Sequence, residues 1–263
     1  MDKVVVSSNY FYERTVQAAR AHMTSKQPQS AITVHRARDR FSTNIGWLDG
    51  RHSFSFGRHY DPNNVGHGVL LVSNDDRVKP GSGFDTHPHR DMEIVTWILD
   101  GEVEHKDSEG NRGMLYPGLA QRMSAGTGIW HSEMNPSSDS TVHLVQMWVV
   151  PDTESINPGY EQLDINNELN KGGLVPIASG RGHDAAISIR QKGAVLLGGR
   201  LQAGETVEIP DERFVHVFVA RGGADMDGVG LLAEADAARL TAAGARTMTA
   251  DVEGAEVLIW AMS

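Results

Sequence analysis

Cysteine is absent from the 263-residue sequence, and this absence removes several kinds of chemistry at once. Disulfides, iron–sulfur clusters, thiolate zinc sites and cysteine nucleophiles all require a sulfur that the chain does not contain. Any metal bound by this protein must therefore be held by histidine and carboxylate side chains.

Basic residues and long apolar runs are also scarce. Lys and Arg total 24 against 34 Asp and Glu, giving a formal net charge of −10, which argues against a nucleic acid held through its phosphates. No run approaches the roughly 18 apolar residues of a membrane span, and the N-terminus has no apolar stretch followed by a small-residue cleavage site. We expect a soluble, cytoplasmic protein with no direct nucleic-acid partner and no membrane association.

The apolar segments that are present have the length of β-strands. Glycine, at 28 residues, exceeds the average of roughly 7%, and clusters of Gly, Pro, Asn and Asp separate the apolar segments. Short strands between turns predict an all-β sandwich or barrel. Residues 1–30 lack this pattern and are expected to be an N-terminal extension, disordered or partly helical. The expected strands include Ile32–Val34, Val69–Val72, Ile94–Leu99, Val142–Val150, Ala194–Leu201, Val215–Ala220 and Val257–Met262.

The chain also contains an internal repeat. The Ala-rich stretch Ala233–Ala245 has helical propensity of its own, but the repeat predicts a strand within it. A boundary between the two halves is expected near Pro151–Gly159, where Pro, Asn and Gly concentrate. The repeated segments are Ile94–Val103 with Phe214–Gly223, and Ala120–Gly126 with Ala238–Gly244, the second pair at an offset of 118 residues.

Two short motifs in the first repeat indicate a metal site. His87-Pro88-His89 and His131-Ser132-Glu133 each contain two ligand residues at spacing i, i+2, which turns both side chains to one face of a strand. Three imidazoles and one carboxylate suit Fe(II), Mn(II), Ni(II), Cu(II) or Zn(II) and leave positions for water or substrate. Pro88 places its motif at a strand start, a bulge or a sheet edge. The motifs predict a catalytic kind of site.

The residues alone leave two candidates for the carboxylate ligand. Glu93 lies at i+4 from His89 and would share its strand parity, whereas Glu133 is paired with His131.

The other histidines do not form such pairs. The offset of 118 residues carries His131 and Glu133 onto Thr249 and Asp251, so the second repeat has lost the metal pair. The unpaired histidines are expected to be solvated or hydrogen-bonded structural residues: His35, His52, His59, His67, His105, His143, His183 and His216.

The motifs resemble those of the pirin family of the cupin superfamily. The resemblance is close across about Val34–Val150, thinner through the C-terminal half, and does not cover the first 30 residues. It rests on Gly46–Gly57, Gly83–Glu93, Leu99–Ser108, Pro117-Gly118, Met123–Met134 and Gln146–Val149.

This resemblance implies a bicupin, in which two jelly-roll β-barrels pack face to face. Residues 31–157 would form a metal-binding cupin domain, and residues 158–263 a degenerate cupin domain without metal. The ligands of pirins carry over as His87, His89, His131 and Glu133, which leaves Glu93 as a second-choice ligand or as a partner of a ligand. The expected cofactor is one divalent transition metal, Fe(II) before Mn, Ni, Cu or Zn.

The resemblance also implies an activity. Some bacterial pirins resemble quercetin 2,3-dioxygenases, which open the flavonol ring with O2 and release carbon monoxide. Glu133 would then be both a ligand and the catalytic base that takes a hydroxyl proton from a small phenolic or flavonol substrate. Residues expected to line an apolar pocket, or else to belong to the barrel core, are Phe54, Phe56, Trp97, Met123 and Trp130.

Two other functions remain open. Animal pirins resemble metal- or redox-sensing interaction proteins, so the chain could instead bind a protein partner without any turnover. A third hypothesis is a metal-binding cupin that acts on a small metabolite unrelated to quercetin.

Overall fold

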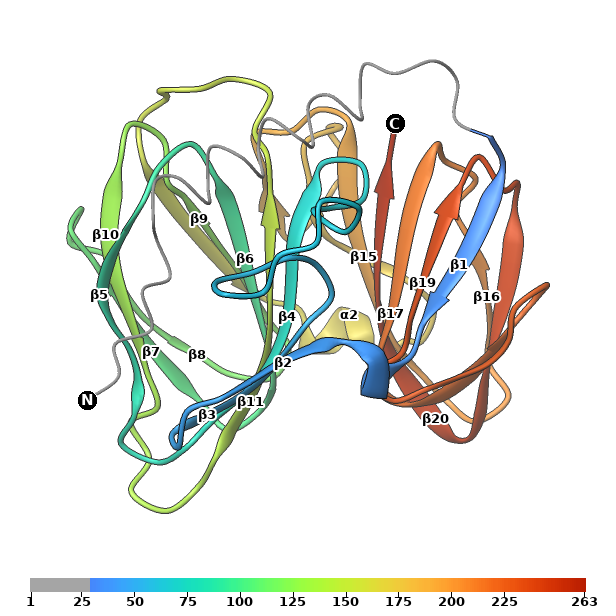
Figure 1. The fold of residues 1–263 in the computed structure, drawn as a ribbon, viewed down its shortest axis with the longest axis horizontal. Helices are drawn as coiled ribbons and strands as arrows, with labels where there is room; N and C mark the ends of the chain where they lie inside the picture. Colours follow the sequence, from blue (N-terminus) through green and yellow to red (C-terminus); the bar gives the residue numbers. More distant parts are fainter. Residues whose placement is uncertain (1–28) are drawn as a thin grey trace.

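The computed structural model describes residues 29–263, which form two β-barrels side by side (Figure 1). Nearly all regular structure is β-strand, as the sequence predicted. Of the expected N-terminal extension, residues 1–28 lie outside the described residues. The described helices are one 3-10 turn at Ala37–Asp39 and the short helix α2 at Asn166–Leu169.

The N-terminal barrel joins two antiparallel sheets. Its strands are β2 (Phe41–Asn44), β3 (Leu48–His52), β4 (Leu70–Val78), β5 (Gly83–His89), β6 (Glu93–Asp100), β7 (Val103–Asp107), β8 (Arg112–Leu115), β9 (Leu119–Ser124), β10 (Ile129–Met134), β11 (Val142–Val149) and β12 (Gly159–Asp164). The larger sheet has the order β12-β9-β6-β11-β4-β3-β2 and faces the other barrel, while the smaller sheet has the order β5-β10-β7-β8 (Figure 1).

The C-terminal barrel is one continuous sheet that curls on itself. Its strands are β1 (Ala31–His35), β13 (Val175–Ser179), β14 (Ile187–Ser188), β15 (Ala194–Leu201), β16 (Thr206–Ile209), β17 (Phe214–Met226), β18 (Gly230–Ala233), β19 (Ala237–Thr241) and β20 (Arg246–Met262). The main path is β1-β19-β17-β20-β15-β13-β14. The long strands β17 and β20 also pair with β18 and β16, which closes the second wall.

The sequence repeat appears as a common strand order. The run β9-β6-β11-β4 of the first barrel matches β19-β17-β20-β15 of the second. Strand β19 lies within the Ala-rich stretch, because most of its side chains are buried in a sheet and this burial outweighs helix propensity.

At the position that matches the metal motif, the structure departs by one residue from the 118-residue offset of the sequence repeat. Thr249 is partly exposed, whereas its neighbours Met248 and Ala250 belong to the buried core of the second barrel. A shift of one residue along a strand turns a side chain to the opposite face. The position that matches His131 inside the second barrel is therefore apolar, and Thr249 lies on the outside.

Strand pairing does not follow the division at residue 157. Strand β1 precedes the first barrel in sequence but pairs with β19 of the second, with Ala31 opposite Thr241. Strand β12 follows residue 157 but pairs with β9 of the first barrel. As folding units, residues 31–157 and 158–263 remain a proposal, and the sheets exchange a strand across those limits.

An apolar core fills the seam between the two large sheets. Val95 and Trp97 from β6 belong to the same buried cluster as Phe218 from β17 and Trp260 from β20. The Trp260 Nε1–H points at the sulfur of Met147, 3.2 Å away. Since burying one large apolar side chain contributes about 1.5–3 kcal/mol, this shared core holds the barrels in one arrangement.

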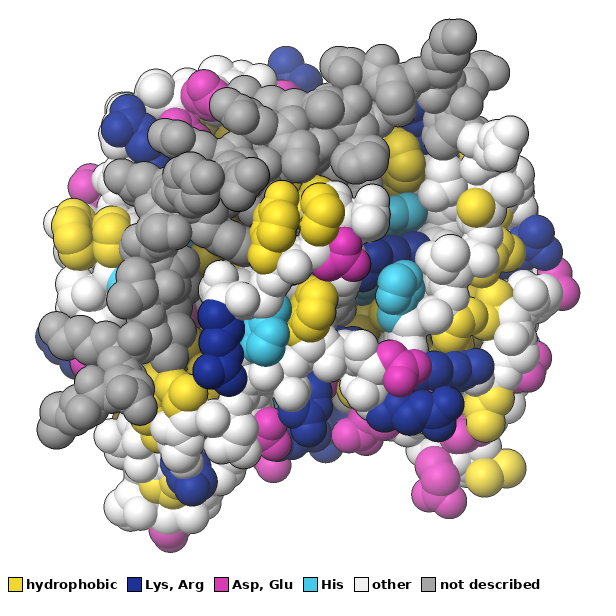
Figure 2. Space-filling model, viewed as in Figure 1, with side chains coloured by type: hydrophobic (Ala, Val, Ile, Leu, Met, Phe, Trp, Pro, Cys, Tyr) yellow, Lys and Arg dark blue, Asp and Glu magenta, His cyan; other side chains and the backbone are white. Residues whose placement is uncertain are grey.

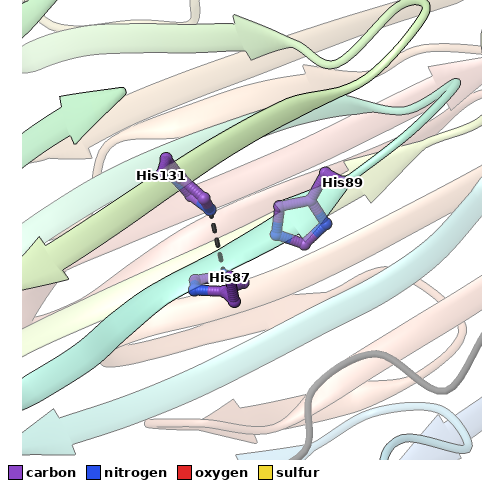
Figure 3. A group of neighbouring side chains, drawn as sticks. All are labelled: His87, His89 and His131. Atoms are coloured by element: carbon purple, nitrogen blue, oxygen red, sulfur yellow. Dashed lines mark hydrogen bonds between the residues drawn. The ribbon is translucent and has the colours of Figure 1, made fainter. Parts of the chain in front are cut away.

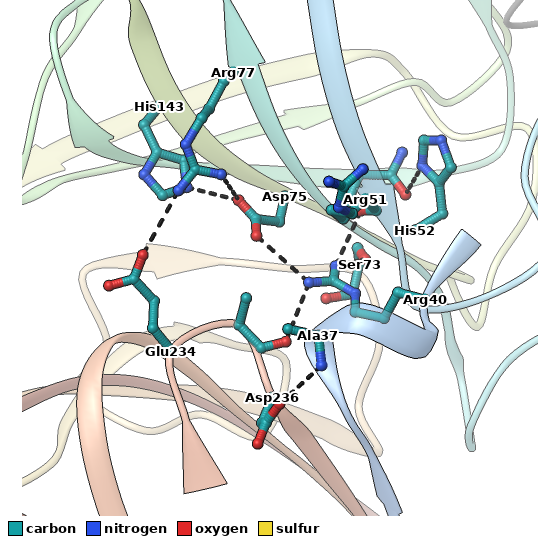
Figure 4. Close-up of polar contacts among 12 residues, drawn as sticks. Ala37, Arg40, Arg51, His52, Ser73, Asp75, Arg77, His143, Glu234 and Asp236 are labelled. Carbon is teal, nitrogen blue, oxygen red and sulfur yellow. Dashed lines mark hydrogen bonds and ion pairs between the residues drawn. The ribbon is translucent and has the colours of Figure 1, made fainter. Parts of the chain in front are cut away.

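A polar network borders this apolar core (Figure 4). The buried Asp75 carboxylate lies 2.6 Å from His143 Nε2 and 3.4 Å from the Arg40 guanidinium, and Arg40 also donates to the carbonyl of Ala235 in the second barrel. Burial alone would raise the pKa of Asp75, but these two partners hold it below its ordinary value. A second contact across the seam joins Arg77 to Glu234 at 3.6 Å.

The surface carries charges of both signs. In Figure 2, acidic and basic side chains are interspersed over the visible face, and histidines gather near its middle. Within residues 29–263, none of the helices is both long and apolar enough to traverse a lipid bilayer.

Candidate metal centre

Two neighbouring strands of the smaller sheet bring the predicted histidines together. Strands β5 and β10 pair antiparallel, with His87 opposite His131 and His89 opposite Ile129. Strand alternation turns His87, His89 and His131 to the barrel side. Pro88 faces away, opposite Trp130, and β5 is the edge strand of its sheet, so the missing backbone donor costs no ladder bond inside the sheet.

The three imidazoles are close enough to share one metal ion (Figure 3). Their ligand atoms lie within 4.8 Å of one another. The Nε2 atoms of His131 and His87 are 3.0 Å apart. Two nitrogens bound at about 2.1 Å to one metal and at a right angle are separated by about 3.0 Å, so this spacing suits two ligands of the same ion.

The hydrogen-bond pattern leaves His87 and His89 each with an Nε2 atom that can bind a metal. His87 Nδ1 lies 2.7 Å from the carbonyl oxygen of Asp85 and donates to it, which leaves Nε2 as the unprotonated nitrogen. His89 Nε2 is buried and has no hydrogen-bond partner among the described residues. A metal ion would satisfy a buried nitrogen that has no hydrogen-bond partner and lies beside two other imidazoles, so these residues fit the expected cofactor.

Glu133 belongs to a second group that overlaps the first. Its carboxylate lies with His131 and His105 in a buried set whose ligand atoms are within 4.8 Å of one another. Gln146 Nε2 donates to Glu133 Oε2 at 2.7 Å, and Thr96 Oγ donates to Oε1 at 3.3 Å. His131 is thus common to both groups and connects Glu133 to the other two predicted ligands.

Glu93 lies on the other face of the larger sheet. Its carboxylate accepts hydrogen bonds from Ser124 Oγ at 2.9 Å and from the backbone N–H of Arg190 at 3.0 Å, towards the second barrel. The parity argument fails because His89 ends β5, Glu93 begins β6, and the turn between them contains Asp91 at φ 45°. Burial raises the pKa of Glu93.

Burial also affects the imidazoles. It is the main reason that the pKa values of His89 and His131 lie well below 6.5, and the neighbouring histidines add to the effect. Both rings are therefore neutral at neutral pH, which is the form that binds a metal.

His105 is a residue that sequence reasoning missed. The sequence groups it with the solvated or hydrogen-bonded structural histidines. It is hydrogen-bonded to Asp107, and it is also fully buried, with its Nδ1 3.5 Å from Nδ1 of His131. The available signal was the pair His105-x-Asp107, which has the same i, i+2 spacing as the two metal motifs.

The residues expected to line a pocket divide between several places. Phe56 and Met123 belong to the cluster inside the first barrel that also contains Trp148, whose ring meets that of His89 edge-on at 4.8 Å. Phe54 and Trp97 belong to the seam core instead. Trp130 is 54% exposed on the outer face.

The sequence matches two family models. The model described as Pirin covers residues 33–149, and the model described as Quercetinase C-terminal cupin domain covers residues 176–262.

Named relatives cover most of the chain. A Mycobacterium tuberculosis protein named "putative quercetin 2,3-dioxygenase" is 56% identical over 234 residues, which are 89% of this chain and 96% of that protein. The quercetin 2,3-dioxygenase of Escherichia coli K12 is 42% identical over 199 residues, 75% of this chain and 85% of that protein.

A solved structure agrees with these matches. The bacterial pirin YhhW from Escherichia coli, in complex with nickel(II), has a TM-score of 0.81 at 38% identity and covers 88% of this chain and 99% of that one. The jelly-roll bicupin fold is thereby confirmed. From its sequence matches and its fold together, the chain belongs to the pirin family of the cupin superfamily.

Proposed function

We propose that this protein is a metal-dependent dioxygenase that opens the ring of quercetin or a related flavonol with O2. The observation that carries the proposal is the set of three converging imidazoles with a buried, unpartnered nitrogen at His89. The names of the relatives support the substrate class, and the nickel(II) complex of the related pirin supports a divalent metal. These names favour turnover over the protein-interaction alternative.

His87, His89, His131 and Glu133 are the proposed ligands of one divalent metal, with Fe(II) as the expected ion. A metal held by these residues would supply Lewis acidity towards an ionised hydroxyl and towards O2. His87 is the least buried of the three histidines, so substrate approaches from its side. Phe56, Met123 and Trp148 give the interior near His89 an apolar wall suited to a flat phenol.

Glu133 is the proposed base. Gln146 and Thr96 hold one oxygen each, which fixes the orientation of the carboxylate beside the ligands. Trp148 Nε1 donates to Gln146 Oε1 at 2.9 Å, so the amide cannot turn without losing a buried hydrogen bond. A base held in this way can take the proton of the flavonol hydroxyl as that group approaches the metal.

The test begins with identification of the bound metal by mass spectrometry of purified protein. Metal-loaded and metal-free protein are then given quercetin in air and under nitrogen, and quercetin absorbance, O2 uptake and carbon monoxide are followed. We expect loss of the flavonol only with metal and O2 together, with carbon monoxide released in equal amount. Fully metallated protein that neither consumes O2 nor binds flavonols would overturn the proposal.

A further inference from the structure

A buried chain of side chains extends from His131 away from His87. His105 lies on β7, next to β10, and its Nδ1 is 3.5 Å from Nδ1 of His131. On its other side, His105 Nε2 is 3.2 Å from Oδ2 of Asp107. Both side chains are shielded from solvent, and the ring of Tyr160 packs against His105 with the centroids 4.9 Å apart.

Asp107 is held as a hydrogen-bond acceptor by the turn that follows β7. Its Oδ1 accepts the backbone N–H groups of Glu109 at 3.0 Å and Asn111 at 2.9 Å. The side-chain amide of Asn111 donates to both carboxylate oxygens, at 3.1 and 2.9 Å. With these donors in place, Oδ2 accepts the Nε2–H of His105.

This arrangement fixes the hydrogens along the chain. Because His105 Nε2 carries its hydrogen, its Nδ1 offers a lone pair to His131. His131 must then carry its hydrogen on Nδ1, which leaves Nε2 unprotonated at 3.0 Å from His87 Nε2. The other tautomer of His131 could donate to His87 Nε2 but would place two lone pairs against each other at 3.5 Å on the His105 side. The Nδ1–H tautomer is therefore the one that both neighbours allow when a shared cation takes the Nε2 lone pairs of His131 and His87.

We propose that Asp107 and His105 are positioning residues, which hold His131 in the one tautomer and ring orientation that can bind the metal. The inference rests on the metal-binding part of the proposed function and not on flavonol oxidation. Carboxylate–histidine pairs behind a ligand raise metal affinity in this way, and their loss costs roughly tenfold to a hundredfold. The rival role for His105 is direct ligation together with His131 and Glu133.

The test measures nickel(II) affinity and the tautomer of His131 in the full chain. His105→Phe keeps a ring but removes the acceptor, whereas His105→Asn returns an acceptor oxygen near the place of Nδ1. Val103→Ala, at a buried position of the same strand, is the control for a general loss of packing. The tautomer is read from ¹⁵N shifts of the imidazole nitrogens in protein loaded with zinc(II), a diamagnetic ion of the same charge.

We expect His105→Phe to bind nickel(II) at least about tenfold more weakly, with His105→Asn recovering most of the loss and Val103→Ala close to wild type. Wild-type His131 should carry its hydrogen on Nδ1. Equal loss in the Phe and Asn variants would overturn the inference in favour of direct ligation, and so would a wild-type His131 protonated on Nε2. If wild-type protein binds neither nickel(II) nor zinc(II), the metal proposal itself fails, whereas metal bound as tightly by His105→Phe as by wild type overturns this inference alone.

Discussion

Two buried glutamates lie near the metal motifs, and their side chains project to different sides of the first barrel wall. Glu133 lies beside His131 and accepts from Gln146, while Glu93 faces the second barrel and accepts from Ser124. Their spacing in the sequence does not separate these roles, because the turn before Glu93 breaks the alternation on which parity arguments depend.

Replacing each glutamate by glutamine tests this difference directly. Glu133→Gln should lower kcat for quercetin by roughly a hundredfold or more, because a general base contributes about 10²–10⁴ in rate, while quercetin binding changes much less. Glu93→Gln is the matched control and should leave kcat within about twofold, since its carboxylate lies outside the site. Steady-state kinetics on variants of known metal content give the answer. Equal losses in the two variants would contradict the assignment of the base.

Removal of two imidazoles tests the ligand set. A His87→Ala, His131→Ala double variant should lose most of its bound metal, because two of the four proposed ligands are gone. Circular dichroism should still show the fold, since the seam core and the core of the second barrel contain neither residue. Near-stoichiometric metal in the folded double variant, measured by mass spectrometry, would rule out this set of ligands.

At the scale of elements, the turn that leads into the strand bearing His131 is held by the loop between β11 and β12. Gly126, in the turn from β9 to β10, has φ +47°, and an added Cβ would clash with the carbonyl oxygen of Ile156. That same carbonyl accepts the N–H of Thr127 at 2.8 Å. The loop between β11 and β12 thus holds the start of the strand that bears His131.

Gly126→Ala should destabilise the protein because both the positive φ and the close backbone approach oppose a side chain. Gly110→Ala is the control, since Gly110 also has a positive φ, +89°, but nothing lies within 4 Å of the added Cβ. We expect a cost of about 1 kcal/mol for the strain alone and a larger cost at Gly126, measured by urea unfolding. Similar costs at both positions would mean that the loop between β11 and β12 moves to accommodate the side chain.

The sequence predicted the features that depend on residue spacing within one strand or on similarity between the two halves of the chain. The spacing of His87 with His89 and of His131 with Glu133 needs only strand alternation, and the repeat predicted strand β19 against its helical propensity. The contact of His105 with His131 could not be predicted, because it depends on which strands are neighbours in the smaller sheet. The offset of 118 residues matched His131 to Thr249, whereas Met248 beside it is the buried residue. Sequence similarity between two segments does not determine which face of a strand a residue occupies.

At the scale of the whole molecule, buried histidines make stability depend on pH. Burial lowers the pKa of His67, at the seam, and of His52, inside the first barrel, to about 4 each. His67 Nε2 lies 2.9 Å from the carbonyl oxygen of Leu240 in the second barrel and ties the two halves together. In the unfolded chain both residues have an ordinary pKa of about 6.5.

Between about pH 6.5 and pH 4, the unfolded chain therefore binds protons that the folded protein does not, and stability falls as the pH falls. Each residue should contribute a loss of about 1 kcal/mol at about pH 5.5 relative to about pH 7.5. Urea unfolding at the two pH values measures this loss, and His67→Gln should reduce it. His183→Gln, at an exposed position, is the control. A loss unchanged by His67→Gln would contradict the role of that residue.

The pairing of β1 with β19 has a consequence for synthesis of the chain. The first described strand emerges from the ribosome early, but its only paired neighbour among the described strands lies about 200 residues later, so it must wait for most of the protein to be made. Until then its backbone groups are unpaired, and the same is true of the edge of β19 in any fragment that begins after residue 35. Such an edge invites pairing with another chain. Fragments of the second barrel made alone should therefore aggregate, whereas in a chain that includes β1 this early strand covers the edge of the barrel made last.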